Sequence, residues 1–344
     1  MTQSGSVPVV IAVDLSDALL EDIRAVSPRL HVERHFPTVP ERAWDDAEIV
    51  YTISALPQPD QAPRLRWVQL HSAGFDHVLD HPLIKAQDVE VTSTSGIHAV
   101  QMAEYCLAMM LAFNYNLPKM LELKSRAEWP QKRPGALHLD DLFRPYELRG
   151  QTLGIVGYGS VGRELARVAD ALGMKVLAIK RDVMHPREEE AYREPGTGDP
   201  EGEIPARLYP PEAIQSLARE ADYLVLTIPL TAKTRHMIDA QVLASMKPTG
   251  VLINVARGPV VDEKALISAL AAHKIRGAAL DVFDEEPLPS TSPLWNLDNV
   301  IISPHVSGNS RRYHEKAVSV FIENLERYLN NRPLLNRLRR EQEY

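Results

Sequence analysis

Short apolar runs alternate with segments of helical spacing along most of this chain. In the first hundred residues, an apolar run at Val7–Asp14 precedes helical spacing at Asp17–Ala25, and further runs cover Glu48–Ile53 and Trp67–His71. Runs of this length and composition are typical of short strands. Strands that alternate with helices favour a parallel sheet with helices on its faces. The pattern therefore predicts a small α/β unit at the N-terminal end.

A second alternating pattern begins near residue 150. A strand at Thr152–Val156, a glycine-rich turn, a helix at Val161–Leu172 and a strand at Lys175–Ile179 follow one another closely. Helical spacing continues between later strands, which we expect at Tyr223–Thr227, Val251–Val255, Gly277–Asp281 and Val300–Ser303. The fold class predicted from both patterns is α/β, with parallel, doubly wound sheets.

Three further segments have distinct patterns. Met102–Phe113 is apolar on every side, so we expect a helix buried against a second domain or a second subunit. Residues 182–207 are polar and acid-rich and contain proline and glycine, which predicts a long surface loop between the second and third strands of the later pattern. Ser310–Tyr328 has the spacing of an amphipathic helix.

Composition narrows the class of protein. The length of 344 residues favours two domains, and 44% hydrophobic with 24% charged residues is ordinary for a soluble globular chain. A net charge of −8 argues against nucleic acid and anionic membranes as partners. No apolar run approaches the length of a membrane helix, and the N-terminus lacks a signal-peptide pattern. The single cysteine, Cys106, is expected to be a core residue in a reducing compartment, so the cytoplasm is the default location.

The glycine-rich turn, Gly157-Tyr158-Gly159-Ser160-Val161-Gly162, carries the first chemical signal. It follows a predicted strand and opens a predicted helix, which is the context that a dinucleotide-binding turn requires. Gly157 permits the tight turn, Gly159 lets a pyrophosphate approach the backbone, and Gly162 lets the helix pack on the strand. The pyrophosphate then accepts hydrogen bonds from free N–H groups at the helix start. A tight turn without a ligand is the alternative.

The end of the next predicted strand bears on cofactor choice. A chain that prefers NAD usually has an acidic residue there to bind the ribose hydroxyls. Lys180 and Arg181 occupy this place instead, and two cations suit the 2′-phosphate of NADP. We therefore expect NADP to be preferred over NAD. The alternatives are that both cations are solvated, or that Asp182 turns inward and binds the ribose.

Charged residues follow three of the later strands. Arg257, Asp281, Glu286 and His305 come after runs whose carboxyl ends share one edge of a parallel sheet, so they are able to converge. Arg257 suits bidentate binding of a carboxylate, and histidine exchanges protons near neutral pH. Glu286 suits a hydrogen bond to the second ring nitrogen of His305 and favours the charged ring. Hydride transfer to a 2-keto acid needs such a clamp and such an acid. Taken singly, each of these residues also fits an ordinary surface position.

With these residues in place, the chain resembles the D-isomer-specific 2-hydroxyacid dehydrogenases. The resemblance runs over roughly residues 45 to 336. It rests on HSAGFDHV (71–78), SGIHAVQMAEYCLAMMLAF (95–113), GYGSVG (157–162), TIPLTAKTRHMI (227–238), NVARGPVVDEKAL (254–266), GAALDVFDEEPL (277–288) and NVIISPH (299–305).

The resemblance implies roles for residues at matched positions. Arg257 corresponds to the substrate-binding arginine, Glu286 to the acid paired with histidine, and His305 to the general acid/base. The backbone at Ala73 and Gly74 is similar to the loop that binds the substrate carboxylate. The cofactor-binding positions, in addition to the glycine turn with Ser160 and Val161 and to Lys180 and Arg181, are Met102, Thr227, Pro229, Thr234, Val255, Ala256 and Asp281, of which Asp281 holds the nicotinamide amide.

The resemblance also implies an organisation. A Rossmann cofactor domain at 101–305 is expected to be inserted in a flavodoxin-like substrate domain formed by 1–100 and 306–344, with a small 2-keto or 2-hydroxy acid bound in the cleft. NADP or NAD is the cofactor, no metal is implied, and the family is typically homodimeric through its cofactor domains. The 182–207 loop is longer than usual in the family.

Within the family we favour the glyoxylate/hydroxypyruvate reductase branch, because use of NADPH suits reduction. The alternative from another class is a dinucleotide-sensing, corepressor-like binding protein on the same fold. The sequence has no basic patch that would support that alternative.

Overall fold

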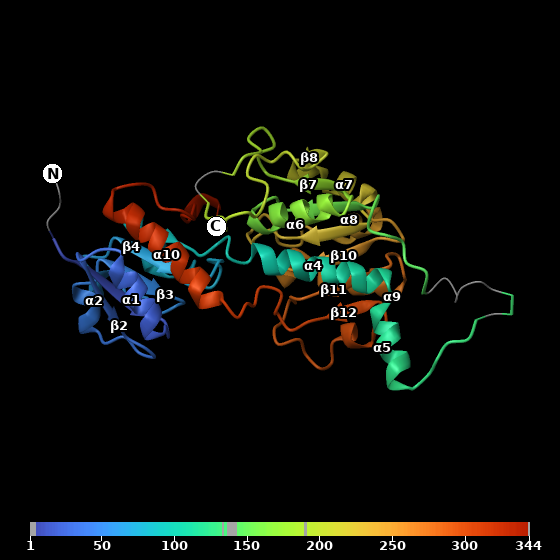
Figure 1. Ribbon diagram of the computed structural model, residues 1–344, viewed down its shortest axis with the longest axis horizontal. Coiled ribbons are helices and arrows are strands. Elements are labelled where there is room, and N and C mark those ends of the chain that lie inside the picture. The colour runs from blue at the N-terminus through green and yellow to red at the C-terminus, as the bar shows by residue number, and fades with distance from the viewer. Residues whose placement is uncertain (1–4, 133, 136–142, 189–190, 343–344) are drawn as a thin grey trace. The chain divides into compact units, whose positions relative to one another are not determined.

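The computed structural model divides the chain into two compact units, each described here by itself (Figure 1). The residues described are 5–132, 134–135, 143–188 and 191–342. The first unit comprises Met1–His98, Glu189–Pro195 and Ser310–Tyr344, and the second comprises Ala99–Glu188 and Gly196–Asn309. A short piece of the 182–207 segment therefore belongs to the first unit, although the sequence on both sides of it belongs to the second.

The first unit is a five-stranded parallel sheet with helices on both faces. Its elements are β1 (Val7–Ala12), α1 (Asp17–Ala25), β2 (Leu30–Arg34), α2 (Arg42–Asp45), β3 (Ile49–Thr52), η1 (Pro59–Gln61), β4 (Trp67–Leu70), α3 (Pro82–Lys85), β5 (Glu90–Thr92), α10 (Tyr313–Leu329) and η6 (Arg340–Gln342). The strand order β2-β1-β3-β4-β5 is the flavodoxin-like order, as predicted. Alternate residues of β1 enter different cores: Val9 and Ile11 pack with Phe321 of α10, whereas Val10 packs with Trp44 of α2.

The second unit is a seven-stranded parallel sheet, also covered on both faces. Its elements are α4 (Ala99–Asn114), α5 (Leu117–Ser125), β6 (Thr152–Val156), α6 (Ser160–Ala171), β7 (Lys175–Ile179), β8 (Arg207–Tyr209), η3 (Pro211–Ala213), α7 (Ile214–Glu220), β9 (Tyr223–Leu226), α8 (Ala240–Ser245), β10 (Val251–Asn254), η4 (Gly258–Val260), α9 (Glu263–Ala271), β11 (Gly277–Leu280), η5 (Pro293–Asn296) and β12 (Val300–Ile302). The order β12-β11-β10-β9-β6-β7-β8 is that of a Rossmann fold with one added strand, as predicted.

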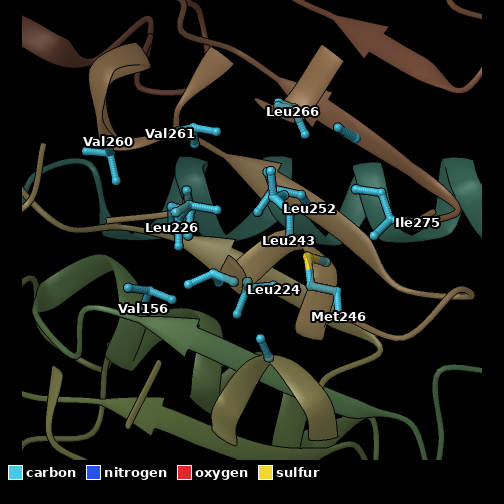
Figure 2. Close-up of a cluster of buried hydrophobic side chains, with 14 of the residues drawn as sticks. Val156, Leu224, Leu226, Leu243, Met246, Leu252, Val260, Val261, Leu266 and Ile275 are labelled. Carbon is cyan, nitrogen blue, oxygen red and sulfur yellow. The ribbon is translucent and has the colours of Figure 1, made fainter. Parts of the chain in front are cut away.

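The core of the second unit lies in two layers, one on each side of its sheet. Figure 2 shows the layer under α7, α8 and α9, where Leu224, Leu252 and Leu266 are among the buried side chains. The opposite layer lies under α4 and α6 and contains Ile155 and Ile253. Because neighbouring residues of a strand face opposite sides, the central residues of the strands between these layers are apolar. Truncation of one such leucine to alanine typically costs about 2–5 kcal/mol of stability.

Four of the predicted strands of the second unit extend one residue too far at their carboxyl ends. Thr227, Val255, Asp281 and Ser303 leave the sheet and begin loops. Three short strands, β2, β5 and β8, were not predicted, because all three lie at sheet edges and bury only one or two side chains each. The final helix begins at Tyr313 and not at Ser310.

Helix α4 is less buried than its sequence predicts. Cys106, Met110 and Phe113 pack in the core beside α6, and Figure 1 shows these two helices side by side. The partner of this face is therefore a helix of the same unit, whereas the expectation was a second domain or a second subunit. Leu111, on another face of α4, is 39% exposed. Cys106 is buried with a free thiol, and burial raises its pKa, as expected for a core cysteine.

Among the residues that the structure describes, no helix is both long and apolar enough to cross a bilayer.

Candidate active site at the carboxyl edge of the second sheet

The strands of the second sheet are all parallel, so their carboxyl ends lie along one edge. The loops that leave this edge carry nearly every predicted site residue of the unit. The glycine turn follows β6 and Lys180 follows β7, whereas Arg257, Asp281 and His305 follow β10, β11 and β12. The chain order reverses between β6 and β9, and ligands of open α/β sheets bind at such a reversal.

The glycine turn leaves room for a ligand at one of its three glycines. Gly157 has φ +109°, and a Cβ there would come within 2.6 Å of the Ile228 side chain. A Cβ at Gly162 would collide with the carbonyl oxygen of Gly157, so this glycine allows α6 to pack on the turn. A Cβ at Gly159 would meet nothing within 4 Å, and no side chain caps the helix that begins at Ser160. The open space and the uncapped N–H groups fit a pyrophosphate.

One residue of the 182–207 segment, Asp199, is buried behind this turn, whereas the other described residues of the segment are exposed or half-buried, as predicted for a surface loop. The carboxylate of Asp199, which is 6% exposed, accepts hydrogen bonds from Tyr158 Oη at 2.5 Å and from the N–H groups of Gly202, Glu203 and Ile204. Burial by itself raises the pKa of Asp199, but the hydrogen bonds from Tyr158 and the backbone outweigh burial and lower the pKa. Residues 189 and 190 of the segment lie outside the described residues.

A buried arginine ties the same segment to helix α6. The guanidinium of Arg163 donates to the carbonyl oxygens of Asp199 and Pro186 and lies 4.7 Å from the centre of the Tyr158 ring. Both Tyr158 and Arg163 are neighbours of the fingerprint glycines in sequence. No sequence pattern indicated this contact, because the segment that supplies the acceptors is irregular and distant along the chain.

The residues after β7 form a compact turn. Lys180 Nζ donates to the carbonyl oxygens of Asp182 at 3.1 Å and His185 at 2.7 Å. Burial, together with the charge of Arg163, lowers the pKa of Lys180. The carboxylate of Asp182 accepts from the N–H groups of Met184 and His185 and from His185 Nδ1 at 2.7 Å. This turn therefore already engages Asp182, which sequence reasoning left open as a ribose ligand.

The loop after β9 is held by hydroxyl groups. Thr227 Oγ1 donates to the carbonyl oxygen of Gly157 at 2.7 Å and so joins this loop to the glycine turn. Thr234 Oγ1 donates to the carbonyl oxygen of Pro229 at 2.7 Å, and the Thr231 N–H donates to Thr234 Oγ1 at 2.8 Å. These three predicted cofactor positions thus lie in one loop that begins beside the fingerprint.

The turn that carries Arg257 is shaped by a buried asparagine. Asn254 accepts from the Ala256 N–H at 3.0 Å and donates to the Arg257 carbonyl oxygen at 3.1 Å. Val255 and Ala256 are buried, whereas the Arg257 side chain is half-buried. A Cβ at the next residue, Gly258, would collide with the backbone of Phe283, so this glycine brings the loops after β10 and β11 together.

The loops after β11 and β12 bring an acid and a histidine into contact. Glu286 Oε1 accepts from the Phe283 N–H at 3.0 Å, and Glu286 Oε2 lies 2.7 Å from His305 Nδ1. Both side chains are partly exposed, at 35% for Glu286 and 48% for His305. With Nδ1 facing a carboxylate, the proton on that nitrogen is fixed and Nε2 is left for another partner.

Asp281 is fully buried and contacts the loop that bears His305. Its carboxylate oxygens accept from the N–H groups of Val306 and Ser307, each at 2.9 Å, and from the hydroxyl of Ser303. Its carbonyl oxygen accepts from the His305 N–H at 2.9 Å. The prediction assigned this side chain to the nicotinamide amide, and sequence reasoning missed its contacts with the histidine loop.

The remaining predicted residues lie elsewhere. Met102 is on α4 and packs against the core layer that contains Tyr158. Ala73 and Gly74 belong to the first unit and follow β4, where Ser72 Oγ donates to the Gly74 carbonyl oxygen at 3.0 Å. In the part of the chain that the structure describes, no group of three or more histidine, cysteine or acidic side chains is arranged to hold a metal ion.

Comparison with known proteins agrees with this geometry. Residues 107–307 match the family model of the D-isomer specific 2-hydroxyacid dehydrogenase NAD binding domain. Glyoxylate reductase of Pyrococcus furiosus is 35% identical over 266 residues, which are 77% of this chain and 73% of that protein.

Two solved structures have the same fold over nearly the whole chain. A D-isomer specific 2-hydroxyacid dehydrogenase family protein of Aeromonas salmonicida has a TM-score of 0.78 at 28% identity, with 98% of this chain and 100% of that chain covered. A D-isomer specific 2-hydroxyacid dehydrogenase of Xanthobacter autotrophicus, solved with NADPH, has a TM-score of 0.78 at 26% identity, with 99% of this chain and 100% of that chain covered.

The family model covers more than half of the chain. The chain therefore belongs to the D-isomer specific 2-hydroxyacid dehydrogenase family and is an NAD(P)-dependent oxidoreductase that interconverts 2-keto and 2-hydroxy acids.

Proposed function

We propose that this enzyme reduces a small 2-keto acid with NADPH, and that Arg257, Glu286 and His305 carry the chemistry. The observation that carries the proposal is the 2.7 Å contact between Glu286 and His305 Nδ1 in loops that adjoin the Arg257 turn. Glyoxylate reductases are among the relatives, which supports the glyoxylate/hydroxypyruvate reductase branch.

In the proposed reaction, His305 is the general acid. The reduced nicotinamide supplies the hydride to the carbonyl carbon when it is bound. His305 Nε2 donates a proton to the carbonyl oxygen, so that hydride and proton together convert the keto acid to the hydroxy acid. Glu286 holds the imidazolium in orientation through Nδ1 and stabilises its charge.

We assign the binding of substrate to one arginine and to one backbone segment. The planar guanidinium of Arg257 suits the carboxylate and the carbonyl oxygen together, because its donors are spaced for bidentate contacts. The backbone at Ala73 and Gly74 binds the carboxylate as well. The half-buried position of Arg257 supports this role, since partial burial strengthens the attraction to an anion.

The cofactor is proposed to lie along the carboxyl edge of the second sheet. Gly157, Gly159, Ser160, Val161 and Gly162 hold its pyrophosphate. Further positions line the rest of the cofactor, and these are Met102, Thr227, Pro229, Thr234, Val255, Ala256 and Asp281. The functional division that follows is a substrate domain at 1–100 and 306–344 and a dinucleotide-binding domain at 101–305.

Preference for NADP is proposed from the turn after β7. Asp182 is engaged by its own turn, so no acidic side chain there is presented to the ribose hydroxyls. Lys180 is held by two carbonyl oxygens, and Arg181 has an exposed side chain beside it. Two cations at this place favour a 2′-phosphate.

The proposal includes a homodimer and a cytoplasmic location. Large apolar side chains are exposed on α4 and α5, with Leu117 at 45% and Leu121 at 55%, and a second subunit would cover them. Light scattering of the purified protein should give the mass of two chains, and the mass of one chain would refute the homodimer. A free thiol at Cys106 fits a reducing compartment, and fractionation of cells is the test of location.

Steady-state kinetics tests the central proposal. NADPH and NADH are compared against glyoxylate, hydroxypyruvate, pyruvate and bulkier 2-keto acids. We expect the highest kcat/KM with NADPH and one small keto acid. A better kcat/KM with NADH would refute the cofactor preference. No observation favours the corepressor-like alternative, and turnover above trace rates would exclude it.

A further inference from the structure

The backbone of His305 has a conformation that needs support from its surroundings. His305 has φ +52°, in the left-handed region that residues with a side chain rarely adopt. Such a residue persists only where neighbouring groups hold it in place. Asp281 is the main support, because four hydrogen bonds from the 303–307 loop end on this one residue.

A chain of hydroxyl groups links this support to helix α4. Tyr105 Oη lies 2.6 Å from Ser303 Oγ, and Ser303 Oγ donates to Asp281 Oδ1. A carboxylate that receives N–H donors acts as an acceptor, so the single proton of Ser303 points to Asp281. The proton of Tyr105 then points to Ser303. The direction of the whole chain is therefore fixed, from Tyr105 through Ser303 to Asp281.

Tyr105 is well suited to the first place in this chain. Its side chain is partly buried, and burial raises its pKa to about 12, so the hydroxyl keeps its proton at neutral pH. Helix α4 has a second contact with the same loop, because Gln101 Nε2 donates to the Gly308 carbonyl oxygen at 3.3 Å. The helix therefore holds the loop on both sides of His305.

We propose that Tyr105 and Ser303 are positioning residues for proton transfer, which act through Asp281 to fix the backbone at His305 and the contact of its ring with Glu286. This inference rests on the proposed role of His305 as the general acid. Tyr105 touches neither substrate nor cofactor in the proposal; it acts on the loop alone.

The test uses conservative variants of the full chain. Tyr105→Phe removes one hydroxyl and keeps the ring. Ser303→Ala removes the link, whereas Ser303→Thr keeps its hydroxyl. The matched control is Tyr223→Phe, which removes a buried hydroxyl from the same core layer. The Tyr223 hydroxyl donates to Asn114 Oδ1 at 2.5 Å and not to the histidine loop.

We expect Tyr105→Phe to lower kcat about fivefold, the change that loss of one hydrogen bond typically produces, with KM for NADPH nearly unchanged. The pH at which reduction is half-maximal should fall, because the ring of His305 is held less firmly against Glu286. Ser303→Ala should do the same and Ser303→Thr should restore the rate. The double variant that combines Tyr105→Phe with Ser303→Ala should be no slower than Ser303→Ala alone, since the two hydroxyl groups act in series.

Amide hydrogen exchange gives a readout that does not depend on turnover. The N–H groups of Val306 and Ser307 donate to Asp281, so their exchange should be about fivefold faster in Tyr105→Phe and unchanged in Tyr223→Phe. The inference would be overturned if Tyr105→Phe had the same kcat, the same pH profile and the same exchange rates as the wild type. An equal loss of kcat in Tyr223→Phe would also overturn it, because general destabilisation would then explain the loss.

The same measurements separate this inference from the proposed function. If His305→Ala retains full activity, the role of His305 itself is wrong. If His305→Ala is inactive while Tyr105→Phe behaves as wild type, only the positioning role fails.

Discussion

Replacement of Gly159 by alanine should weaken cofactor binding without weakening the fold. A Cβ at this position would meet nothing within 4 Å, and the backbone has φ −92° and ψ −162°, which alanine adopts readily. Stability should therefore be unchanged or higher by about 0.4–1 kcal/mol, because the unfolded chain loses freedom. The new methyl group, however, occupies the space beside the uncapped start of α6 where the pyrophosphate is proposed to bind.

The size of the effect follows from the bonds that the pyrophosphate would lose. A hydrogen bond to a charged group contributes about 1.5–3 kcal/mol. Loss of one such bond raises Kd by about 10- to 150-fold, at 1.4 kcal/mol for each factor of ten. Fluorescence titration of the purified variant with NADPH measures this Kd, and thermal unfolding measures stability in the same sample.

Gly162→Ala is the matched control, because the same methyl group is there placed against protein. Its Cβ would collide with the carbonyl oxygen of Gly157 and approach Ile155 Cγ2 at 3.0 Å. Overpacking of this kind costs about 1–3 kcal/mol, or about 2–4 °C in Tm for each kcal/mol in a domain of this size. A Gly159→Ala variant that binds NADPH like the wild type would refute the placement of the pyrophosphate.

Four further outcomes are expected. His305→Ala should lower kcat about 10²–10⁴-fold and leave the Kd for NADPH nearly intact; an unchanged rate would refute its role. Glu286→Gln should move the pH profile of reduction downward, because the imidazolium of His305 loses the carboxylate 2.7 Å from its Nδ1, and a profile that stays in place would exclude the pairing. Arg181→Asp should lower kcat/KM with NADPH about tenfold or more but spare NADH, whereas equal losses would argue against a 2′-phosphate site. Asp199→Asn should lower Tm at pH 7. Because the pKa of Asp199 is lowered in the folded protein, its carboxylate stabilises the fold above about pH 4, and this stabilisation is lost as the pH falls through that pKa. The difference in Tm between wild type and variant should therefore shrink below about pH 4.

Elements whose side chains are buried on both sides could be predicted from the sequence. The bounds of β6 and β7 agree with the prediction, because a strand covered by helices on two faces is apolar over most of its length. β2 escaped prediction, since only Val32 among its five residues is buried and its pattern resembles that of a loop. A strand is recognised in the sequence by its buried apolar residues, and an edge strand has few of them.

The candidate site divides in the same way. Gly157, Gly159 and Gly162 could be recognised because their spacing is local, and Gly157 and Gly162 each have a steric reason within one short turn. The contact between Glu286 and His305 could be anticipated, because both follow strands whose carboxyl ends share an edge. No comparable rule led from the sequence to the hydrogen bonds of Tyr105 or to the burial of Asp199.

The sequence alone thus determined the two sheets, the glycine turn and the identity of the residues at the strand ends. Tertiary structure decided which polar groups meet across long separations. Ser303 lies 22 residues from Asp281 and 198 residues from Tyr105, and the acceptors of Arg163 lie in a segment without periodicity. The physical reason is that periodicity reports which face of an element is buried, whereas a hydrogen bond depends on the position of two single atoms, and these are fixed only when the elements pack.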